Sequence, residues 1–320
     1  MWVSEEPFHW DAFAILGSLA QATSRIRLGP GVTSPYLRPP HLQAMSIATL
    51  DRLSGGRAFM GLGRGLTQWY RHLLGIDVGR PVEAMEEAIA LLRGWWQEPY
   101  EASSPGGHFG VQGLRREAGG IQPYLPIYLA AVGPSMVRLA ARGADGVVFY
   151  WPSSEFLEKV IPLVKKEGAA AGRDMSSFAF VVQTGLRVTE DAEAALEELK
   201  GRMAVIYSIP GLDNALVSSR HDVSRVVAGL RELMRSGEVL NKGGWLREFD
   251  QLSDLEAGRR AIPSDLAAEV AVVGDSAAVR KRLARYQALG VTHVFAPLPQ
   301  GNAVEYKALL GDINPNPGIF

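Results

Sequence analysis

Four short segments hold the side chains and backbone groups most suited to binding a small molecule. They are the acidic pair Glu5 and Glu6, and the glycine-containing segments 28–34 (LGPGVTS), 61–65 (GLGRG) and 131–134 (AVGP). Each ends or follows a short apolar run that is typical of a β-strand. In parallel α/β barrels, the carboxyl ends of the strands carry the active site. We therefore expect these segments at the ligand-binding end of such a barrel.

The segment 28–34 (LGPGVTS) is irregular for a strand, and its residues allow two interpretations. Glycine within a strand marks a bulge or a close approach of two backbones, and proline removes a hydrogen-bond donor from the ladder. The segment is then either a structural corner of the barrel or a bulge that presses backbone against a flat ligand. Spacing alone favours neither interpretation.

The other three segments also have alternative interpretations. Segment 61–65 lacks the G-x-G-x-x-G spacing of a dinucleotide site, but it is a glycine-lined strand end. From it Arg64 would meet a carboxylate or phosphate, or form a surface ion pair. Segment 131–134 precedes a helix whose N-terminus suits a phosphate, or it is an ordinary turn. Glu6 is either a general acid or substrate contact, or it is solvated together with Glu5.

Strand and helix patterns alternate along the chain, which predicts right-handed crossovers and a parallel sheet. Barrel strands are expected near residues 2–5, 26–33, 57–63, 126–132, 145–150, 178–188 and 291–297. The predicted fold class is α/β, a (β/α)8 TIM barrel that is one strand short of closure, with 269–274 as a candidate for the eighth strand. Residues 203–265 break the alternation, which predicts a helical insertion before the last strand of a single domain, 1–320.

Composition restricts the classes of function. The 320 residues include 33 basic and 34 acidic side chains without a basic stripe, which argues against nucleic acid as a partner. There is no cysteine and the six histidines show no metal-ligand spacing, so we expect no metal site. No run reaches the ~20 apolar residues of a membrane span, and the N-terminus has no signal-peptide pattern. We expect a cytoplasmic globular protein that acts on a small-molecule substrate.

Taken together, these patterns resemble the luciferase-like monooxygenase superfamily, whose fold is the TIM barrel of the bacterial-luciferase type. The resemblance covers almost the whole chain and is carried by segments 25–40, 47–65, 126–148 and 274–294, including LDRLSGGR, GLGRG and LAARGADGV. It is nearest to the branch that uses the deazaflavin coenzyme F-420, such as methylenetetrahydromethanopterin reductase. This implies F-420-dependent hydride transfer to or from a small organic substrate. An FMN-dependent monooxygenase and a non-catalytic flavin-binding barrel stay open as alternatives.

The resemblance also implies roles for individual residues. In the F-420 branch, a bulged strand with a non-prolyl cis peptide backs the deazaflavin ring, and the matching bond here is Gly31–Val32. By the same matching, the cofactor would be contacted at its ring by Gly31, Val32, Thr33 and Ser34, at its ring or tail by Gly63 and Arg64, and at its ribityl-phosphate by Ala131, Val132, Gly133 and Pro134. Glu6 would be the catalytic residue near the substrate. The family is commonly dimeric, so we expect a homodimer.

Two departures from the family pattern are visible. Relatives begin with a βα unit that has no counterpart before Trp2, so the barrel is expected to lack its first unit. Deazaflavin-dependent sugar-phosphate dehydrogenases carry a His and a Glu where this chain has Glu6 and Leu66. This difference argues against that activity and leaves the proton donor unassigned.

Overall fold

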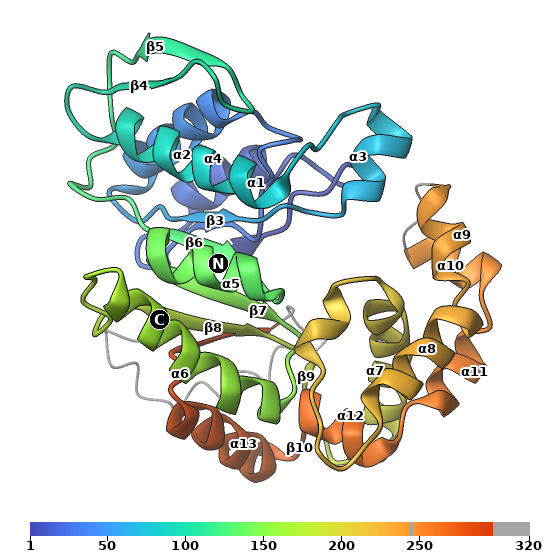
Figure 1. The fold of residues 1–320 in the computed structure, drawn as a ribbon. Coiled ribbons are helices and arrows are strands. Elements are labelled where there is room, and N and C mark those ends of the chain that lie inside the picture. Colours follow the sequence, from blue (N-terminus) through green and yellow to red (C-terminus); the bar gives the residue numbers. More distant parts are fainter. Residues whose placement is uncertain (243–245, 297–320) are drawn as a thin grey trace. The chain divides into compact units, whose positions relative to one another are not determined.

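The computed structural model describes residues 1–242 and 246–296, in which parallel strands alternate with helices (Figure 1). The chain divides into two compact units. The first unit comprises 1–131, 135–147 and 171–178, and the second comprises 132–134, 148–170 and the described residues from 179 onward. Strand β7 (Gly146–Tyr150) contributes residues to both units.

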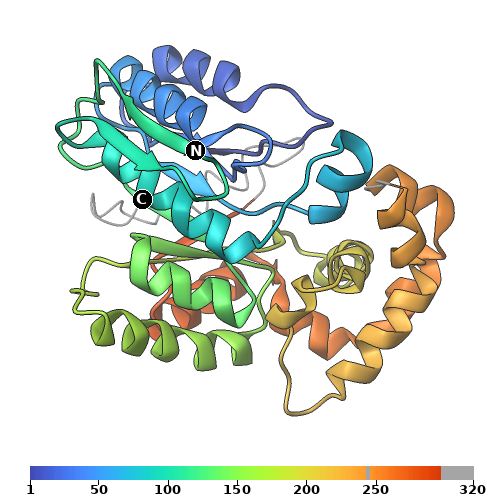
Figure 2. The same cartoon turned by 45° about the horizontal axis from the view of Figure 1, so that its top comes forward.

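The first unit contains the strands that the sequence predicts near the candidate site. Its strands are β1 (Trp2–Val3), β2 (Gly29–Pro30), β3 (Met60–Leu62), β4 (Glu101–Ser104), β5 (Val111–Arg115) and β6 (Ile127–Ala130). Its helices are α1 (Ala12–Ala22), α2 (Pro40–Ser54), α3 (Thr67–Leu74), α4 (Pro81–Trp96) and, from its second residue onward, α5 (Pro134–Gly143). β1 pairs with β2 and β3 with β6, in parallel, whereas β4 and β5 form an antiparallel hairpin against α4 (Figure 2).

Two glycines allow β2 and β3 to approach each other closely. A Cβ on Gly61 would lie 2.0 Å from a backbone oxygen of β2, and a Cβ on Gly29 would lie 2.4 Å from the Phe59 ring. The Phe59 ring in turn packs against Trp2 and Tyr128, with ring centroids 4.4 and 5.4 Å away. The glycines that make the strand pattern irregular are therefore positions where no side chain fits.

The helix boundaries follow local sequence signals. α2 ends at Gly55, which adopts a left-handed conformation (φ 67°) and donates its backbone N–H to carbonyls of the last turn. α4 begins at Pro81, where the missing N–H has no helical partner to lose.

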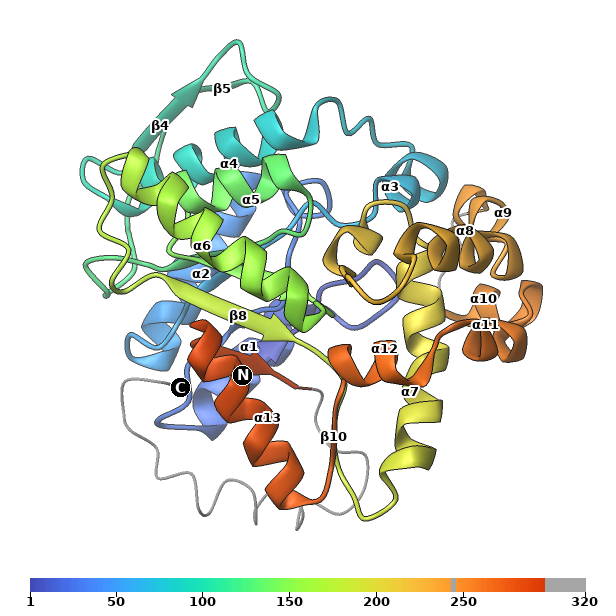
Figure 3. The same ribbon diagram turned by 60° about the horizontal axis from the view of Figure 1, so that its bottom comes forward.

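The second unit holds the remaining elements. They are the strands β8 (Ala179–Gln183), β9 (Leu186–Val188), β10 (Val272–Gly274) and β11 (His293–Phe295), and the helices α6 (Ser154–Ala170), α7 (Ala192–Ser208), η1 (Leu212–Ala215), α8 (Val223–Leu233), α9 (Ser236–Asn241), α10 (Leu246–Leu252), α11 (Leu255–Ala261), α12 (Ser264–Val270) and α13 (Ser276–Leu289). β8 pairs in parallel with β11, and β9 with β10. α7 packs against α8, α11 and α12, while α13 lies beside α6 (Figure 3). The described residues of the predicted insertion at 203–265 are mostly helical, although α7 already begins at Ala192, and the bounds of the insertion stay a prediction.

Two strand predictions need correction. The single strand expected at 178–188 is two strands, because the ladder breaks at Gly185, where a Cβ would lie 2.7 Å from the Trp151 ring. The candidate eighth strand at 269–274 begins only at Val272, since the preceding residues end α12, and it pairs with β9 rather than with β8 or β11. Residue 297 of the predicted last strand lies outside the described residues. The prediction of a single domain over 1–320 stays a prediction.

Candidate ligand-binding site

The segment that follows β2 presents one residue at its surface. Residues 28–36 are buried with the exception of Val32, which is half-buried. The peptide bond between Gly31 and Val32 is cis, which confirms the bond expected from the family resemblance. Val32 is therefore the part of this bulge that a ligand can touch.

The backbone on both sides of Val32 is fully used by hydrogen bonds. Gly31 donates its N–H to β1 (N···O 2.7 Å), and its carbonyl accepts from the Ser4 hydroxyl (3.2 Å). Thr33 donates its N–H to a carbonyl of β3 and accepts from the N–H of Gly63, both at 2.9 Å. Within the described part of the chain, the N–H and C=O of Val32 make no hydrogen bond. These two polar groups are free to face a ligand or water.

Gly63 brings three strand ends of the first unit together. A Cβ at this position would lie 2.6 Å from Cγ2 of Val32 and 3.3 Å from Cβ of Ala130, the last residue of β6. Any side chain at position 63 would occupy the space beside the Val32 surface. The structure thus brings Gly63 and the predicted ring-binding residues Gly31 to Ser34 into one cluster, with buried Ala131 directly after β6.

The first carboxylate of the acidic pair that the sequence analysis singled out supports this cluster. Glu5, whose side chain is only 10% exposed, accepts a hydrogen bond from the Thr33 hydroxyl. The same carboxylate accepts from Nε and Nη2 of Arg38 at 3.0 and 2.8 Å, and Arg38 also pairs with Asp11 at 2.6 Å. Glu5 therefore ties the bulge to the segment that follows it. In the sequence, the signal for this pairing is the cation Arg38, which lies close to the buried segment that follows β2.

Glu6, the predicted catalytic residue, lies in a different environment from its neighbour. Its side chain is 28% exposed, and one carboxylate oxygen lies 3.4 Å from Nε2 of His9, which is more exposed. This geometry leaves Glu6 partly accessible. Its catalytic role stays a prediction.

Arg64 lies just after the end of β3 and is partly buried. Burial lowers the pKa of its guanidinium, and the nearby Tyr36 and Tyr70 only partly offset this effect. Burial raises the pKa of each tyrosine to about 12, so both hydroxyls are neutral near pH 7. The two rings pack 5.3 Å apart, and the Tyr70 hydroxyl lies against Gly65, where a Cβ would be 1.9 Å away. Among the residues that the structure describes, no carboxylate lies within ion-pair distance of Arg64.

The remaining predicted cofactor residues fall in the second unit. Val132, Gly133 and Pro134 belong there, and Pro134 is the first residue of α5. Leu66, where some relatives carry an acid, is buried at 8% exposure. Position 66 therefore provides no acidic side chain to the site.

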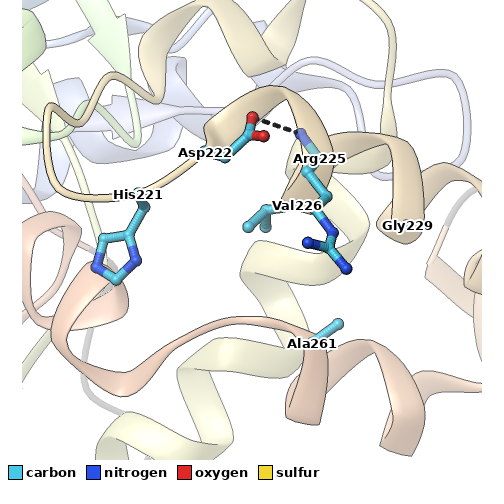
Figure 4. Close-up of a pocket in the computed structure, with 6 residues that line it drawn as sticks. All are labelled: His221, Asp222, Arg225, Val226, Gly229 and Ala261. Atoms are coloured by element: carbon cyan, nitrogen blue, oxygen red, sulfur yellow. Dashed lines mark hydrogen bonds between the residues drawn. The ribbon is translucent and has the colours of Figure 1, made fainter.

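Two surface hollows lie elsewhere. One, of about 320 Å³, is lined by six residues at the start of α8 and the end of α11: His221, Asp222, Arg225, Val226, Gly229 and Ala261 (Figure 4). Its polar groups serve the local fold, since Asp222 caps α8 and His221 lies 2.9 Å from Asp265. The other follows the acidic side of α4 next to β4. Within 1–242 and 246–296, no cluster of His, Asp and Glu side chains is arranged to hold a metal ion, and no helix is long and apolar enough to cross a membrane.

Comparison with known proteins places the chain in a family. A family model described as luciferase-like monooxygenase matches residues 1–293. The chain belongs to this family. Among similar family members, the 5,10-methylenetetrahydromethanopterin reductase of Archaeoglobus fulgidus is 28% identical over 302 residues, which cover 94% of this chain and 85% of the relative. A proposed coenzyme F-420-dependent oxidoreductase of Mycobacterium tuberculosis is 30% identical over 304 residues, covering 88% and 82%.

Solved structures of luciferase-like proteins share the fold. The F-420-dependent tetrahydromethanopterin reductase of Methanopyrus kandleri matches with a TM-score of 0.74 and 24% identity, covering 97% of this chain and 88% of that one. An F-420-dependent secondary alcohol dehydrogenase in complex with an F-420–acetone adduct matches with a TM-score of 0.68 and 19% identity, covering 92% and 83%. The predicted fold class, an α/β TIM barrel of the luciferase type, is confirmed.

Proposed function

We propose that this luciferase-like protein is an F-420-dependent oxidoreductase that moves a hydride to or from a small organic substrate. The observation that carries the proposal is the Val32 surface, where one residue of a buried bulge offers free backbone groups beside the side-chain-free Gly63. A flat ring could lie on such a surface, because position 63 beside Val32 carries no side chain. The similarity to relatives named for F-420 supports the choice of cofactor.

The residues present fit a deazaflavin in the first unit. Val32 would support one face of the ring, and its N–H and C=O would pair with polar atoms at the ring edge. Thr33 donates its hydroxyl proton to Glu5, so this hydroxyl can act only as an acceptor towards a further group. When bound, the deazaflavin would supply the redox chemistry, and the protein would supply orientation and exclusion of water.

Other parts of the proposal rest on the family resemblance. Ala131, Val132, Gly133 and Pro134 are proposed to bind the phosphate of the cofactor, since helix N-termini favour anions. Glu6 is proposed to contact the substrate and to exchange a proton with it, because it is partly exposed next to His9. A homodimer in the cytoplasm stays a prediction.

The test separates the proposed function from the FMN-dependent monooxygenase alternative. The purified protein is loaded with reduced F-420 or with reduced FMN, and oxygen uptake is followed. A deazaflavin carries carbon in place of the flavin N5 and reacts poorly with oxygen. Tight binding of F-420 that stays reduced in air supports the proposal. Rapid oxygen uptake with FMN, together with no binding of F-420, contradicts it.

A further inference from the structure

Arg64 differs from other partly buried arginines of the first unit in what surrounds it. Arg38 is neutralised by Glu5 and Asp11, and Arg93 by Asp145. Arg57 is held by backbone carbonyls and the Thr23 hydroxyl. The described residues around Arg64 include two neutral tyrosines but provide it with neither a hydrogen-bond acceptor nor a carboxylate.

A partly buried guanidinium without an acceptor is unfavourable, because its charge has lost part of its hydration without gaining a partner. Arginine stays protonated even so, and its planar fork of N–H groups matches a carboxylate or phosphate. Tyr36 and Tyr70, whose rings pack 5.3 Å apart, are near enough to Arg64 to interact with it electrostatically, and the Tyr70 hydroxyl lies against the neighbouring Gly65. An arginine in this setting is well suited to bind an anion that arrives with a ligand.

The position of Arg64 indicates which ligand carries that anion. Arg64 directly follows Gly63, which touches the Val32 surface that we propose for the ring. The family resemblance implies that Arg64 contacts the ring or tail of the cofactor. That contact and a contact with the second reactant differ in one measurable respect, which is whether F-420 affinity depends on Arg64. That reactant must lie on the ring in order to exchange a hydride with it.

We propose that Arg64 recognises an oxyanion, a carboxylate or a phosphate group, on the organic substrate, an inference that rests on the proposed function. The substrate class is then an anionic organic molecule whose reacting carbon lies over the ring while its charged group is held at the end of β3. Arg64 is a specificity-determining residue in this account and takes no part in the transfer of hydride.

The test compares three variants of the full chain with the wild type: Arg64→Gln, Arg64→Lys and the control Arg71→Gln. Arg71 is exposed on α3, so its replacement removes the same charge a short distance along the chain. Calorimetric titration with inorganic phosphate, succinate and benzoate is done at constant ionic strength, with and without bound F-420. F-420 affinity is measured separately by fluorescence.

At least one of these anions should bind the wild type, and Arg64→Gln should weaken that binding roughly tenfold or more, the value of a charge-assisted hydrogen bond. Arg64→Lys should retain part of the anion affinity, and Arg71→Gln should bind the anion as the wild type does. The affinity for F-420 should be the same in the wild type and in all three variants. Equal anion binding in wild type and Arg64→Gln, absence of anion binding, or an equal loss of F-420 affinity would overturn the inference. If F-420 does not bind at all, the proposed function fails. Anion binding that depends on Arg64 in the protein without F-420 would still support recognition of an oxyanion by Arg64.

Discussion

The carboxylate of Glu5 provides the sharpest test of how the bulge is held in place. Replacement Glu5→Gln keeps the shape of the side chain and removes its charge. The amide oxygen can still accept from Arg38, and the Thr33 hydroxyl must turn round to accept from the amide N–H. The substitution therefore isolates the electrostatic part of the network.

The size of the effect follows from the bonds that lose their charged acceptor. Glu5 accepts two N–H groups of Arg38 and the hydroxyl of Thr33. A hydrogen bond to a charged group is worth about 1 kcal/mol more than a neutral one. Three such bonds predict a loss of about 2–3 kcal/mol in the free energy of unfolding, at the lower end because Arg38 keeps its ion pair with Asp11.

Urea unfolding followed by tryptophan fluorescence measures this loss, and the chain offers a matched control. Glu83 pairs with Arg80 at 2.6 Å, but both side chains are more than half exposed. Glu83→Gln is expected to cost at most ~1 kcal/mol. If Glu5→Gln destabilises the protein no more than Glu83→Gln does, the idea that Glu5 anchors the bulge is refuted.

Three further predictions concern the ligand surface and pH. Gly63→Val should lower F-420 affinity at least about tenfold while the fold persists, since its side chain would take the space beside Val32; fluorescence titration and circular dichroism check both parts. Because burial raises the pKa of Tyr36 and Tyr70 to about 12, the folded protein binds more protons than the unfolded chain between pH ~10 and 12, and stability should fall as pH rises through this range. In the phenolate absorbance, Tyr36→Phe and Tyr70→Phe should each remove one late titration that the wild type shows, and removal of a titration with an ordinary value near 10 would contradict this. Partial burial raises the pKa of Asp11, but the N–H of Ala14 and the Arg38 guanidinium outweigh it and lower that pKa. The contribution of Asp11 to the free energy of unfolding should therefore disappear as pH falls below ~4. Asp11→Asn should make the free energy of unfolding less dependent on pH in this acid range.

The sequence predicted the strand ends better than the contacts between them. Glycines at positions 29, 61 and 63 indicated close approaches, because a residue without a side chain can be read directly from the sequence. The cis bond at Gly31–Val32 could be expected only from the family resemblance. Backbone geometry of this kind has no signature in residue type alone.

Side-chain partners far apart in the chain could not be predicted. Glu5 and Arg38 are separated by 33 positions, and only the fold shows that the first carboxylate of the pair is buried while Glu6 stays partly exposed. The break after β8 was missed for a related reason. Gly185 interrupts an apolar run that reads as continuous, and the Trp151 ring that fills its place comes from an earlier strand end.

The measurement that tests the central claim most directly is a titration of wild type and Gly63→Val with oxidised F-420 and with FMN, followed by fluorescence and melting temperature. The account predicts that F-420 binds the wild type and stabilises it, that FMN binds much more weakly, and that Gly63→Val loses F-420 binding but still folds. A ligand at 100 times its dissociation constant adds about 2.7 kcal/mol to stability, enough to shift the melting temperature measurably. Binding of FMN alone, or F-420 binding that Gly63→Val leaves unchanged, would contradict the account.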